Sequence, residues 1–475
     1  MSRVVISVVE VSQHHQWSKP KALLKMEIME SQKIKPSRYN HLFSYSDGLR
    51  LAYNSLAGSI LKLDGDNGRK IETMLSGNNN VICPDEMLRK TLIDLKFLVD
   101  DDVNELNIVK YIFKSSSSIE KPIMLTILPT LGCNFGCNYC FERHIKGLMS
   151  KDVQDALVRF VISKLLPKSN SLSIEWFGGE PLLGISVIEN LSEKLKEACL
   201  KFGTNILPGS IITNGYLLDD KMSCKLINLG ITSAQITLDG TPEIHNRRRP
   251  LVTGKGSFEK IIENIKSVFD NLKIIIRINV DAHNKDCIFD LLNLLYNENL
   301  IPKVKPYVAR VESYSEECRS SEGDFLTSEQ FVEFQNDLQR RCMDVGIPWF
   351  SNSTPRLNAC GFCIVDNVNA FVIEPNGKLL KCWAEAGNNK GTEIAHLLRE
   401  ETWNSFAISP LQNRDPFDDE ECCDCKILPA CMGGCPRTRE NHRLQGYKEC
   451  PPMRYSLSED VRNLYNRTNS RLQNI

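Results

Sequence analysis

Long hydrophobic runs and a dominant charge are both missing from this chain of 475 residues. No apolar run approaches the roughly 18 residues that a membrane-spanning helix needs, so we expect no membrane segment. The formal net charge is -1, with 58 basic and 59 acidic residues, so no broad basic field predicts binding to nucleic acid. The first residues have no long apolar core and no small-residue cleavage site, which predicts no export signal.

Repeats and an unusual bulk composition are absent as well. The sequence contains no internal repeat of the solenoid type. Hydrophobic residues make up 42% and charged residues 25% of the chain, which is typical of a globular protein. At roughly 100–200 residues per domain, this length predicts two to four domains.

Cysteine is the residue that stands out. The chain has 18 cysteines, of which three lie between Cys133 and Cys140 and six between Cys422 and Cys450. In a long chain with no predicted export signal, such groups favour metal or cluster ligation over disulfides. Clusters held by thiolates predict a protein of the reducing cytoplasm.

The first 115 residues predict a small domain of strands and helices. His41–Tyr53 alternates around Ser-Asp-Gly, which predicts a β-hairpin. Asn54–Leu63 is predicted as a capped helix, and the apolar residues of Pro84–Val99 recur at helical spacing. Two strands followed by short helices predict a winged-helix-like domain over residues 1–115. The four serines of Ser115–Ser118 predict a flexible linker after it.

Residues 116–345 alternate between strand and helix patterns. The predicted strands are Ile123–Leu128, Leu172–Phe177, Ile211–Thr213, Ala234–Leu238, Lys273–Val280 and Val304–Ala309. The predicted helices are Asp152–Leu166, Val187–Phe202, Asp219–Leu229, Ser257–Phe269 and Ile288–Tyr296. Such alternation predicts an α/β fold with a parallel sheet and right-handed crossovers. Six units make a partial, TIM-like (β/α)6 barrel, because a closed eight-unit barrel takes about 250 residues.

The C-terminal residues lose this rhythm. Across residues 346–455, Gly, Pro, Asn and Cys become more frequent and long periodic runs disappear. A region this rich in loops buries little core, so bound clusters are expected to organise it. Leu457–Leu472 is predicted as a closing helix within residues 456–475.

The first cysteine group, directly after the first predicted barrel strand, has the spacing Cys-x-x-x-Cys-x-x-Cys, at Cys133, Cys137 and Cys140. Three thiolates from one tight loop suit a four-iron cluster in which one iron has no protein ligand. That iron is then open to substrate or cofactor. A zinc site with His144 as a further ligand is the alternative, and a disulfide would leave one odd thiol.

This loop, with Tyr139 before its third cysteine, resembles the radical S-adenosylmethionine (radical SAM) superfamily. The resemblance covers roughly residues 121–345. It implies that Cys133, Cys137 and Cys140 hold a catalytic four-iron cluster, whose open iron binds the amino and carboxylate groups of SAM beside Tyr139. In that superfamily an electron from the cluster cleaves SAM, and the 5′-deoxyadenosyl radical abstracts hydrogen from the substrate.

A glycine motif follows the second predicted strand. Alone, Gly178-Gly179-Glu180 would be an ordinary turn. Two glycines at a strand end let the backbone approach a ligand closely, and a glutamate can accept from an ammonium group. After such a cysteine loop, the motif resembles the SAM amino-group site of the superfamily.

Three later residues complete the SAM site that the resemblance implies. Thr237, at the end of the fourth strand, matches a SAM-contacting hydroxyl. Arg249 matches an arginine that holds the SAM carboxylate, for which a guanidinium fork is suited, although three consecutive arginines also fit a solvated loop. Of Arg277 and Asn279, one is expected to face the cofactor while the other ties down loops, and Asn279 is our candidate.

The second cysteine group resembles the SPASM domain that extends many radical SAM enzymes, over about residues 355–455. The full form of that domain binds two auxiliary four-iron clusters, so the resemblance implies three [4Fe-4S] clusters in total. It assigns the inner auxiliary cluster to Cys360, Cys363, Cys382 and Cys435. It assigns the outer one to Cys422, Cys425, Cys431 and Cys450. Cys423 is an open alternative to Cys422, and a zinc ribbon is the alternative for the whole group.

Relatives of this architecture divide by substrate. One group oxidises a Cys or Ser of a sulfatase to formylglycine and has an acidic residue after the cysteine equivalent to Cys382, where this chain has Trp383. A second group modifies ribosomally made peptides, and many of its members capture the leader of the precursor by strand pairing on an N-terminal winged helix. The phrase TLGCNFGCNYCFE and the predicted N-terminal domain resemble the second group.

We therefore predict a radical SAM/SPASM peptide maturase that installs a cross-link or another modification in a precursor peptide. The predicted partners are that peptide, bound through residues 1–115, and an electron donor such as flavodoxin or ferredoxin. The alternatives are an anaerobic sulfatase-maturating enzyme and a non-catalytic iron–sulfur electron carrier. The SAM-site motifs argue against the carrier, because a carrier needs no SAM pocket.

Overall fold

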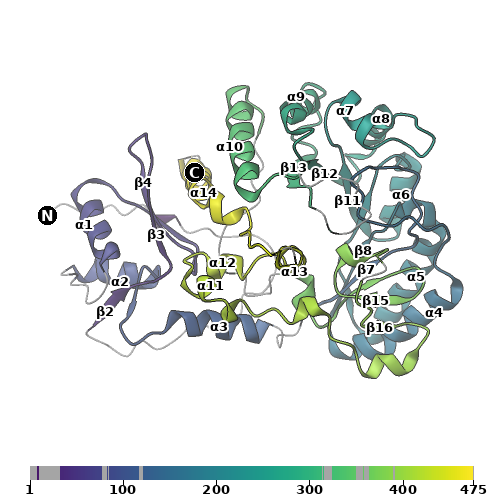
Figure 1. Ribbon diagram of the computed structural model, residues 1–475, viewed down its shortest axis with the longest axis horizontal. Coiled ribbons are helices and arrows are strands. Elements are labelled where there is room, and N and C mark those ends of the chain that lie inside the picture. The colour runs from purple at the N-terminus through teal and green to yellow at the C-terminus, as the bar shows by residue number, and fades with distance from the viewer. Residues whose placement is uncertain are drawn as a thin grey trace.

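The computed structural model describes residues 8–9, 33–77, 83, 85–116, 121–312, 314, 324–348, 357, 363–388, 391–444 and 446–473. Its main element is a mostly parallel ten-stranded sheet, which confirms the predicted α/β class (Figure 1). Across the described residues, no helix is both long and apolar enough to cross a membrane.

Six parallel strands of this sheet follow the predicted strands closely. In sheet order they are β13 (Lys305–Arg310), β12 (Lys273–Val280), β11 (Ile231–Thr237), β10 (Gly209–Thr213), β8 (Ser171–Trp176) and β7 (Ile123–Ile127). A short strand, β9 (Asn205–Ile206), pairs with β8. Because these strands are parallel, their carboxyl ends meet at one edge of the sheet, where ligands bind in α/β folds.

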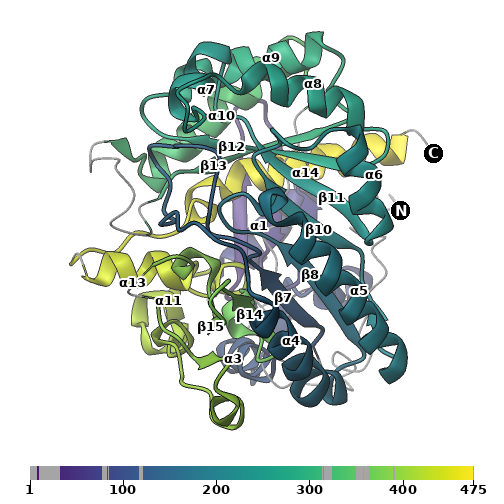
Figure 2. The ribbon, with the colours of Figure 1, turned by 90° about the vertical axis from the view of Figure 1, so that its right-hand side faces the viewer.

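Helices cover the outer side of this curved sheet (Figure 2). They are α4 (Lys151–Phe160), α5 (Ile185–Phe202), α6 (Asp220–Asn228), the short α7 (Pro242–Arg248), α8 (Phe258–Val268), α9 (Ile288–Asn297) and α10 (Ser328–Asp344). Each of the longer ones buries an apolar stripe. In α8, for example, Ile261, Ile265 and Val268 are fully buried at helical spacing.

The C-terminal region extends the same sheet, which the sequence analysis did not predict. Strand β14 (Ala370–Ile373) pairs in parallel with β7, and β15 (Lys378–Leu380) and β16 (Ala395–His396) continue it antiparallel. All four residues of β14 are buried. A strand this short carries no usable period, and its role in covering the open edge of β7 depends on tertiary pairing.

A separate antiparallel sheet lies in the N-terminal part. The predicted hairpin is confirmed, because β3 (Asn40–Ser44) pairs with β4 (Arg50–Asn54). The helix predicted over Asn54–Leu63 is wrong: this segment turns at Gly58, with φ +75°, and forms β5 (Ser59–Lys62). The Asn54 side chain caps the turn instead, by accepting from two backbone N–H groups. A two-residue strand, β1 (Val8–Val9), pairs with the outer edge of β5.

Three helices follow this sheet: α1 (Gly65–Ser76), α2 (Glu86–Asp94) and α3 (Glu105–Ser116). Between α2 and α3, β6 (Leu98–Asp100) pairs with β2 (Ile34–Pro36), so the helix predicted through Val99 ends earlier. The predicted serine linker also differs, since α3 continues through Ser116. Ser117 and Ser118 lie outside the described residues.

The N-terminal and C-terminal parts share hydrophobic cores. One face of the N-terminal sheet, including Leu51 and Tyr53, packs against α12 (Leu428–Cys431) and α14 (Met453–Gln473). In a second cluster, Val109 of α3 packs with Leu428. Figure 1 shows α12 and α14, with α11 (Glu420–Asp424) and α13 (Pro436–Leu444), between the N-terminal sheet and the main sheet. The closing helix is confirmed and begins at Met453, before its predicted start.

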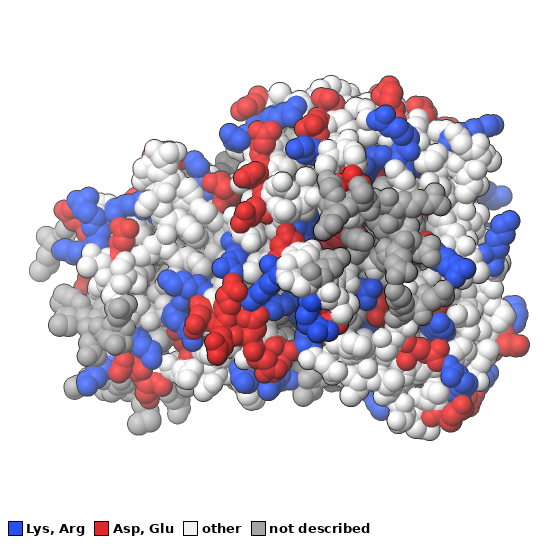
Figure 3. Space-filling view, viewed as in Figure 1, with Lys and Arg blue, Asp and Glu red and all other residues white. Residues whose placement is uncertain are grey.

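Basic and acidic side chains are interspersed on the face of the molecule that Figure 3 shows. One acidic group over α11 is neutralised by basic neighbours. Lys448 pairs with Asp419 and Glu421 at 2.7 and 2.9 Å, and Arg454 pairs with Glu421 at 2.8 Å. These pairs join α11 to the chain around Cys450.

Candidate functional site

The first cysteine loop lies at the carboxyl end of β7. Cys133, Cys137 and Cys140 all line one cavity of about 190 Å³ there. The Phe135 N–H donates to Cys133 Sγ over 3.4 Å. Burial raises the pKa of Cys133 to about 12 and also raises the pKa of Cys137.

Gly178 and Gly179 pack directly on this cysteine loop. A Cβ on Gly178, where φ is +113°, would meet the Thr130 carbonyl oxygen at 2.4 Å. A Cβ on Gly179 would meet the Gly132 carbonyl oxygen at the same distance. Only glycine fits these two positions. The close approach predicted here is therefore to the backbone of the cysteine loop, although both glycines also line the cavity.

Glu180 is completely buried, and its carboxylate ties down the end of β10. Oε1 accepts from Thr213 Oγ1 over 2.8 Å and from the Leu182 N–H over 3.0 Å. Oε2 accepts from the Asn214 N–H over 2.8 Å. Glu180 is the one predicted cofactor residue that does not line the cavity. Acceptance from the SAM ammonium stays a prediction, and the structural role of Glu180 was missed.

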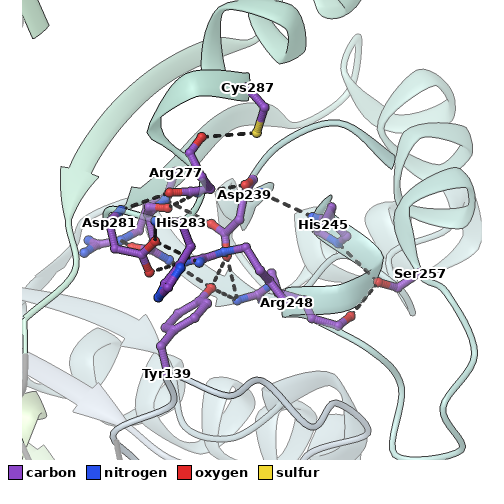
Figure 4. A network of polar contacts seen from close by, with 12 residues as sticks. Tyr139, Asp239, His245, Arg248, Ser257, Arg277, Asp281, His283 and Cys287 are labelled. Carbon is purple, nitrogen blue, oxygen red and sulfur yellow. Dashed lines mark hydrogen bonds and ion pairs between the residues drawn. The ribbon is translucent and has the colours of Figure 1, made fainter. Parts of the chain in front are cut away.

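Tyr139 is the hub of a polar network (Figure 4). Its hydroxyl donates to Asp239, and it accepts from Arg249 Nη1 over 2.6 Å and from Asn279 Nδ2 over 3.2 Å. Three predicted cofactor residues thus meet at one hydroxyl. Asp239 was not predicted as a site residue. Its position just after the carboxyl end of β11, where functional residues of such folds lie, could have indicated it.

The three consecutive arginines have different environments. Arg247 is exposed, whereas Arg248 forms a bidentate pair with Asp281, at 3.0 and 2.8 Å. Arg249 is only 8% exposed, lies 4.0 Å from Asp239 and lines the cavity. Its Nε is one of the buried nitrogens that have no hydrogen-bond partner within the described part of the chain. Arg248 Nε shares this feature, so what distinguishes Arg249 is its place on the cavity, which Arg248 does not line.

The remaining predicted cofactor residues also line the cavity. Thr237 and Asn279 stand near the ends of neighbouring strands, β11 and β12. Arg277 lines it too, and its Nε donates to Asn279 Oδ1 over 2.7 Å. Arg277 thus orients Asn279, which in turn contacts Tyr139.

The C-terminal cysteines fall into two groups in space. In the inner group, Cys363 and Cys382 each lie within electrostatic range of Cys435. Cys360, the fourth predicted member, lies outside the described residues. In the outer group, the thiol of Cys431 lies within the same range of the remaining predicted members, Cys422, Cys425 and Cys450.

Cys422 and Cys423 point to different surroundings. Cys422 Sγ accepts from Arg439 Nη1 over 3.4 Å and lies near the outer cysteines. Cys423 Sγ instead donates to the Phe417 carbonyl over 3.3 Å. The two neighbours are therefore not equivalent.

The zinc alternative with His144 has one supporting contact, since His144 Nε2 lies 3.5 Å from Cys140 Sγ. Within the residues that the structure describes, no three His, Cys, Asp or Glu side chains converge closely enough for a single metal ion. A four-iron cluster has a different requirement, because each iron takes its own thiolate.

Comparison with known proteins identifies the domain that carries this cavity. The model of the Radical SAM superfamily matches residues 127–295. A cysteine-type anaerobic sulfatase-maturating enzyme from Clostridium perfringens is 26% identical over 379 residues, covering 69% of this chain and 95% of the relative. The radical SAM cyclopropyl synthase TigE from Paramaledivibacter caminithermalis is 24% identical over 336 residues, covering 64% and 65%.

Solved structures share the fold. Native anSMEcpe with bound AdoMet superposes with a TM-score of 0.57 at 21% identity, covering 74% of this chain and 100% of its own. Streptococcus suis SuiB bound to precursor peptide SuiA superposes with a TM-score of 0.51 at 15% identity, covering 88% of this chain and 98% of its own.

Proposed function

Since the chain carries a radical SAM domain and is an enzyme of that superfamily, we propose that it modifies a ribosomally made precursor peptide. The superfamily implies SAM and one four-iron cluster, which together supply a hydrogen-abstracting radical. The observation that carries the peptide proposal is the N-terminal sheet, which the cluster chemistry does not need and in which β3 is the last strand among the residues that the structure describes.

The residues of the cavity fit the SAM-binding cluster. Cys133, Cys137 and Cys140 supply three thiols from one loop, as an iron cluster with one open iron requires. Arg249 lines the cavity, and a guanidinium is suited to a carboxylate. Tyr139 holds the Arg249 guanidinium in place.

The C-terminal cysteines fit two auxiliary clusters, in the division that the SPASM resemblance implies. We assign the inner cluster to Cys360, Cys363, Cys382 and Cys435, and the outer cluster to Cys422, Cys425, Cys431 and Cys450. The proximity of Cys435 to Cys363 and Cys382 supports its assignment to the inner cluster. Positive groups flank the outer thiols, because Arg454 Nη1 lies 3.0 Å from Cys450 Sγ and Arg439 contacts Cys422.

The domain boundaries that we propose follow this division. Residues 116–345 form the partial (β/α)6 barrel and residues 346–455 the SPASM domain, with residues 456–475 as the closing helix. Residues 1–115 form a winged-helix-like peptide-recognition domain. It is not an independent unit, because its sheet and α3 bury apolar side chains against the C-terminal helices.

An extended peptide can pair with β3, the last strand of this sheet within the described residues. The Tyr45 N–H donates to the Leu49 carbonyl across the hairpin. In an antiparallel ladder every second residue bonds to the partner strand, so the N–H groups of Leu42 and Ser44 point away from β4. Leu42 also lines a groove of about 1010 Å³. The opposite edge of the sheet is partly covered by β1. We therefore place the precursor peptide on β3.

The test is a substitution that blocks this edge alone. Ser44 is exposed, so Ser44→Pro removes an outward N–H without removing a ladder bond to β4. Ser44→Ala is the matched control. Each holoenzyme is reduced through flavodoxin or ferredoxin, our proposed electron donors, and incubated with SAM and small peptides encoded beside its gene. Mass spectrometry should show slower modification by Ser44→Pro at low peptide concentration and unchanged uncoupled release of 5′-deoxyadenosine.

Sulfatase maturation is the second candidate, and the relatives named as sulfatase-maturating enzymes favour it. Two observations weigh against it. The solved anSMEcpe chain is covered completely by 74% of this chain, which leaves about a quarter without a counterpart there. The position after Cys382 holds Trp383 rather than an acid. Formation of formylglycine in a sulfatase-derived Cys or Ser peptide, with no modification of the neighbouring peptides, would establish this candidate instead.

A further inference from the structure

Four aromatic side chains cluster beside the cysteine loop, and we call them the aromatic wall: Phe141, Phe177, Tyr314 and Trp383. The ring centroid of Phe141 lies 5.5 Å from Trp383, 5.9 Å from Tyr314 and 6.5 Å from Phe177. Trp383 is also 5.7 Å from Tyr314 and 6.1 Å from Phe177. These spacings are typical of aromatic pairs that attract one another.

The wall joins two parts of the molecule that carry cluster cysteines. Phe141 directly follows Cys140, and Phe177 ends the strand region before Gly178. Trp383 directly follows Cys382 and packs in one apolar cluster with it and in another with Phe177. All four aromatic residues line the cavity that also holds Tyr139 and Arg249.

The four aromatic residues of the wall are only partly buried where they line this cavity. None of its four rings is fully buried, although they contact one another. Partly exposed aromatic surface in a concave site is typical of a ligand pocket. Two acidic residues also line this cavity. Glu312 accepts hydrogen bonds from Arg310, over 3.0 Å, and from Thr438, and Glu142 is buried.

We propose that the aromatic wall binds an aromatic or large apolar side chain of the peptide and presents it to the radical, and that Trp383 determines this specificity. This inference rests on the proposed function, since it assumes a peptide substrate. A small Cys or Ser side chain would leave the wall unfilled, whereas a Tyr, Trp or Leu side chain would cover it. The hydrogen atom leaves a carbon of that side chain and is transferred to the 5′ carbon of the deoxyadenosyl radical.

The experiment uses the reconstituted holoenzyme and tripeptide probes of the form acetyl-Gly-Xaa-Gly-amide, with Xaa as Tyr, Leu, Ser or Cys. Dithionite supplies the one electron that each SAM cleavage consumes. Probes deuterated at the Cβ of Xaa report hydrogen transfer as deuterium in 5′-deoxyadenosine. We expect the KM for the Tyr and Leu probes to be at least about fivefold below that for the Ser and Cys probes.

Substitutions then assign the effect to the wall. Trp383→Ala should raise the KM of the Tyr probe about fivefold or more with the KM of SAM unchanged, and Trp383→Phe should restore most of it. Trp403→Phe is the matched control, because Trp403 packs on Phe160 and does not line the cavity.

The inference would be overturned by a KM for the Ser and Cys probes that is equal to or lower than that for the Tyr and Leu probes, or by no turnover of any probe. It would also be overturned if Trp383→Ala changed only the KM of SAM, because the wall would then be an adenine site. Failure of the proposed function looks different. In that case the Tyr probe is still preferred, but Ser44→Pro and wild-type enzyme act equally on every longer peptide.

Discussion

Substituting Arg249 by Gln should weaken SAM binding without loss of iron. The Arg249 side chain is only 10% exposed, donates from Nη1 to the Tyr139 hydroxyl over 2.6 Å and lines the cavity. Loss of a hydrogen bond to a charged group costs about 1.5–3 kcal/mol. At about 1.4 kcal/mol per factor of ten, the Kd for SAM should rise about 10- to 150-fold.

The neighbouring arginines provide two contrasts for this prediction. Arg247 is exposed, so Arg247→Gln is the matched control and should leave the Kd unchanged. Arg248 is committed to Asp281, so Arg248→Gln should lower thermal stability, because removing one partner of a buried ion pair costs about 3–5 kcal/mol.

The measurement is anaerobic equilibrium dialysis with radiolabelled SAM, alongside iron content and a thermal melt for each variant. Asp239 keeps its contacts with Tyr139 and the Asn279 N–H in Arg249→Gln, so we expect the network to stay folded. A Kd within twofold of wild type in Arg249→Gln would refute the reasoning. An equal loss in Arg247→Gln would point to a nonspecific charge effect.

Three further predictions follow from the cysteines and the shared cores. The reconstituted protein should contain about twelve irons, and replacing the three cysteines of the first loop by Ala should remove about one third; iron content near four in the wild type would contradict the two auxiliary clusters. Cys422→Ser should lower iron content by up to about one third, whereas Cys423→Ser should leave it unchanged. The reverse result would make Cys423, and not Cys422, the ligand of the outer cluster. A fragment of residues 1–116 should bind a hydrophobic dye and aggregate, because Leu51, Tyr53 and Val109 would lose their C-terminal partners; a monodisperse fragment with a cooperative melt would show an independent domain.

The parallel sheet was predictable because its signals are local. The pattern of Lys273–Val280, for example, has enough Val and Ile residues to mark a buried strand, and the helices between the strands have a clear period. The spacing of the first cysteine loop is local as well. These patterns depend on neighbouring residues in the chain, so no tertiary information is needed to read them.

The sequence by itself determined the spacing of the cysteines, the match of residues 127–295 to the Radical SAM model and the alternation that builds an α/β sheet. Only the tertiary structure decided which arginine lines the cavity: Arg249 does, whereas Arg248 forms a bidentate pair with Asp281. The same holds for Cys422 and Cys423, for β14 against β7 and for the aromatic wall, whose members lie far apart in the chain. Such contacts depend on how distant segments pack, because burial and partner geometry, rather than residue type, set the role of each side chain.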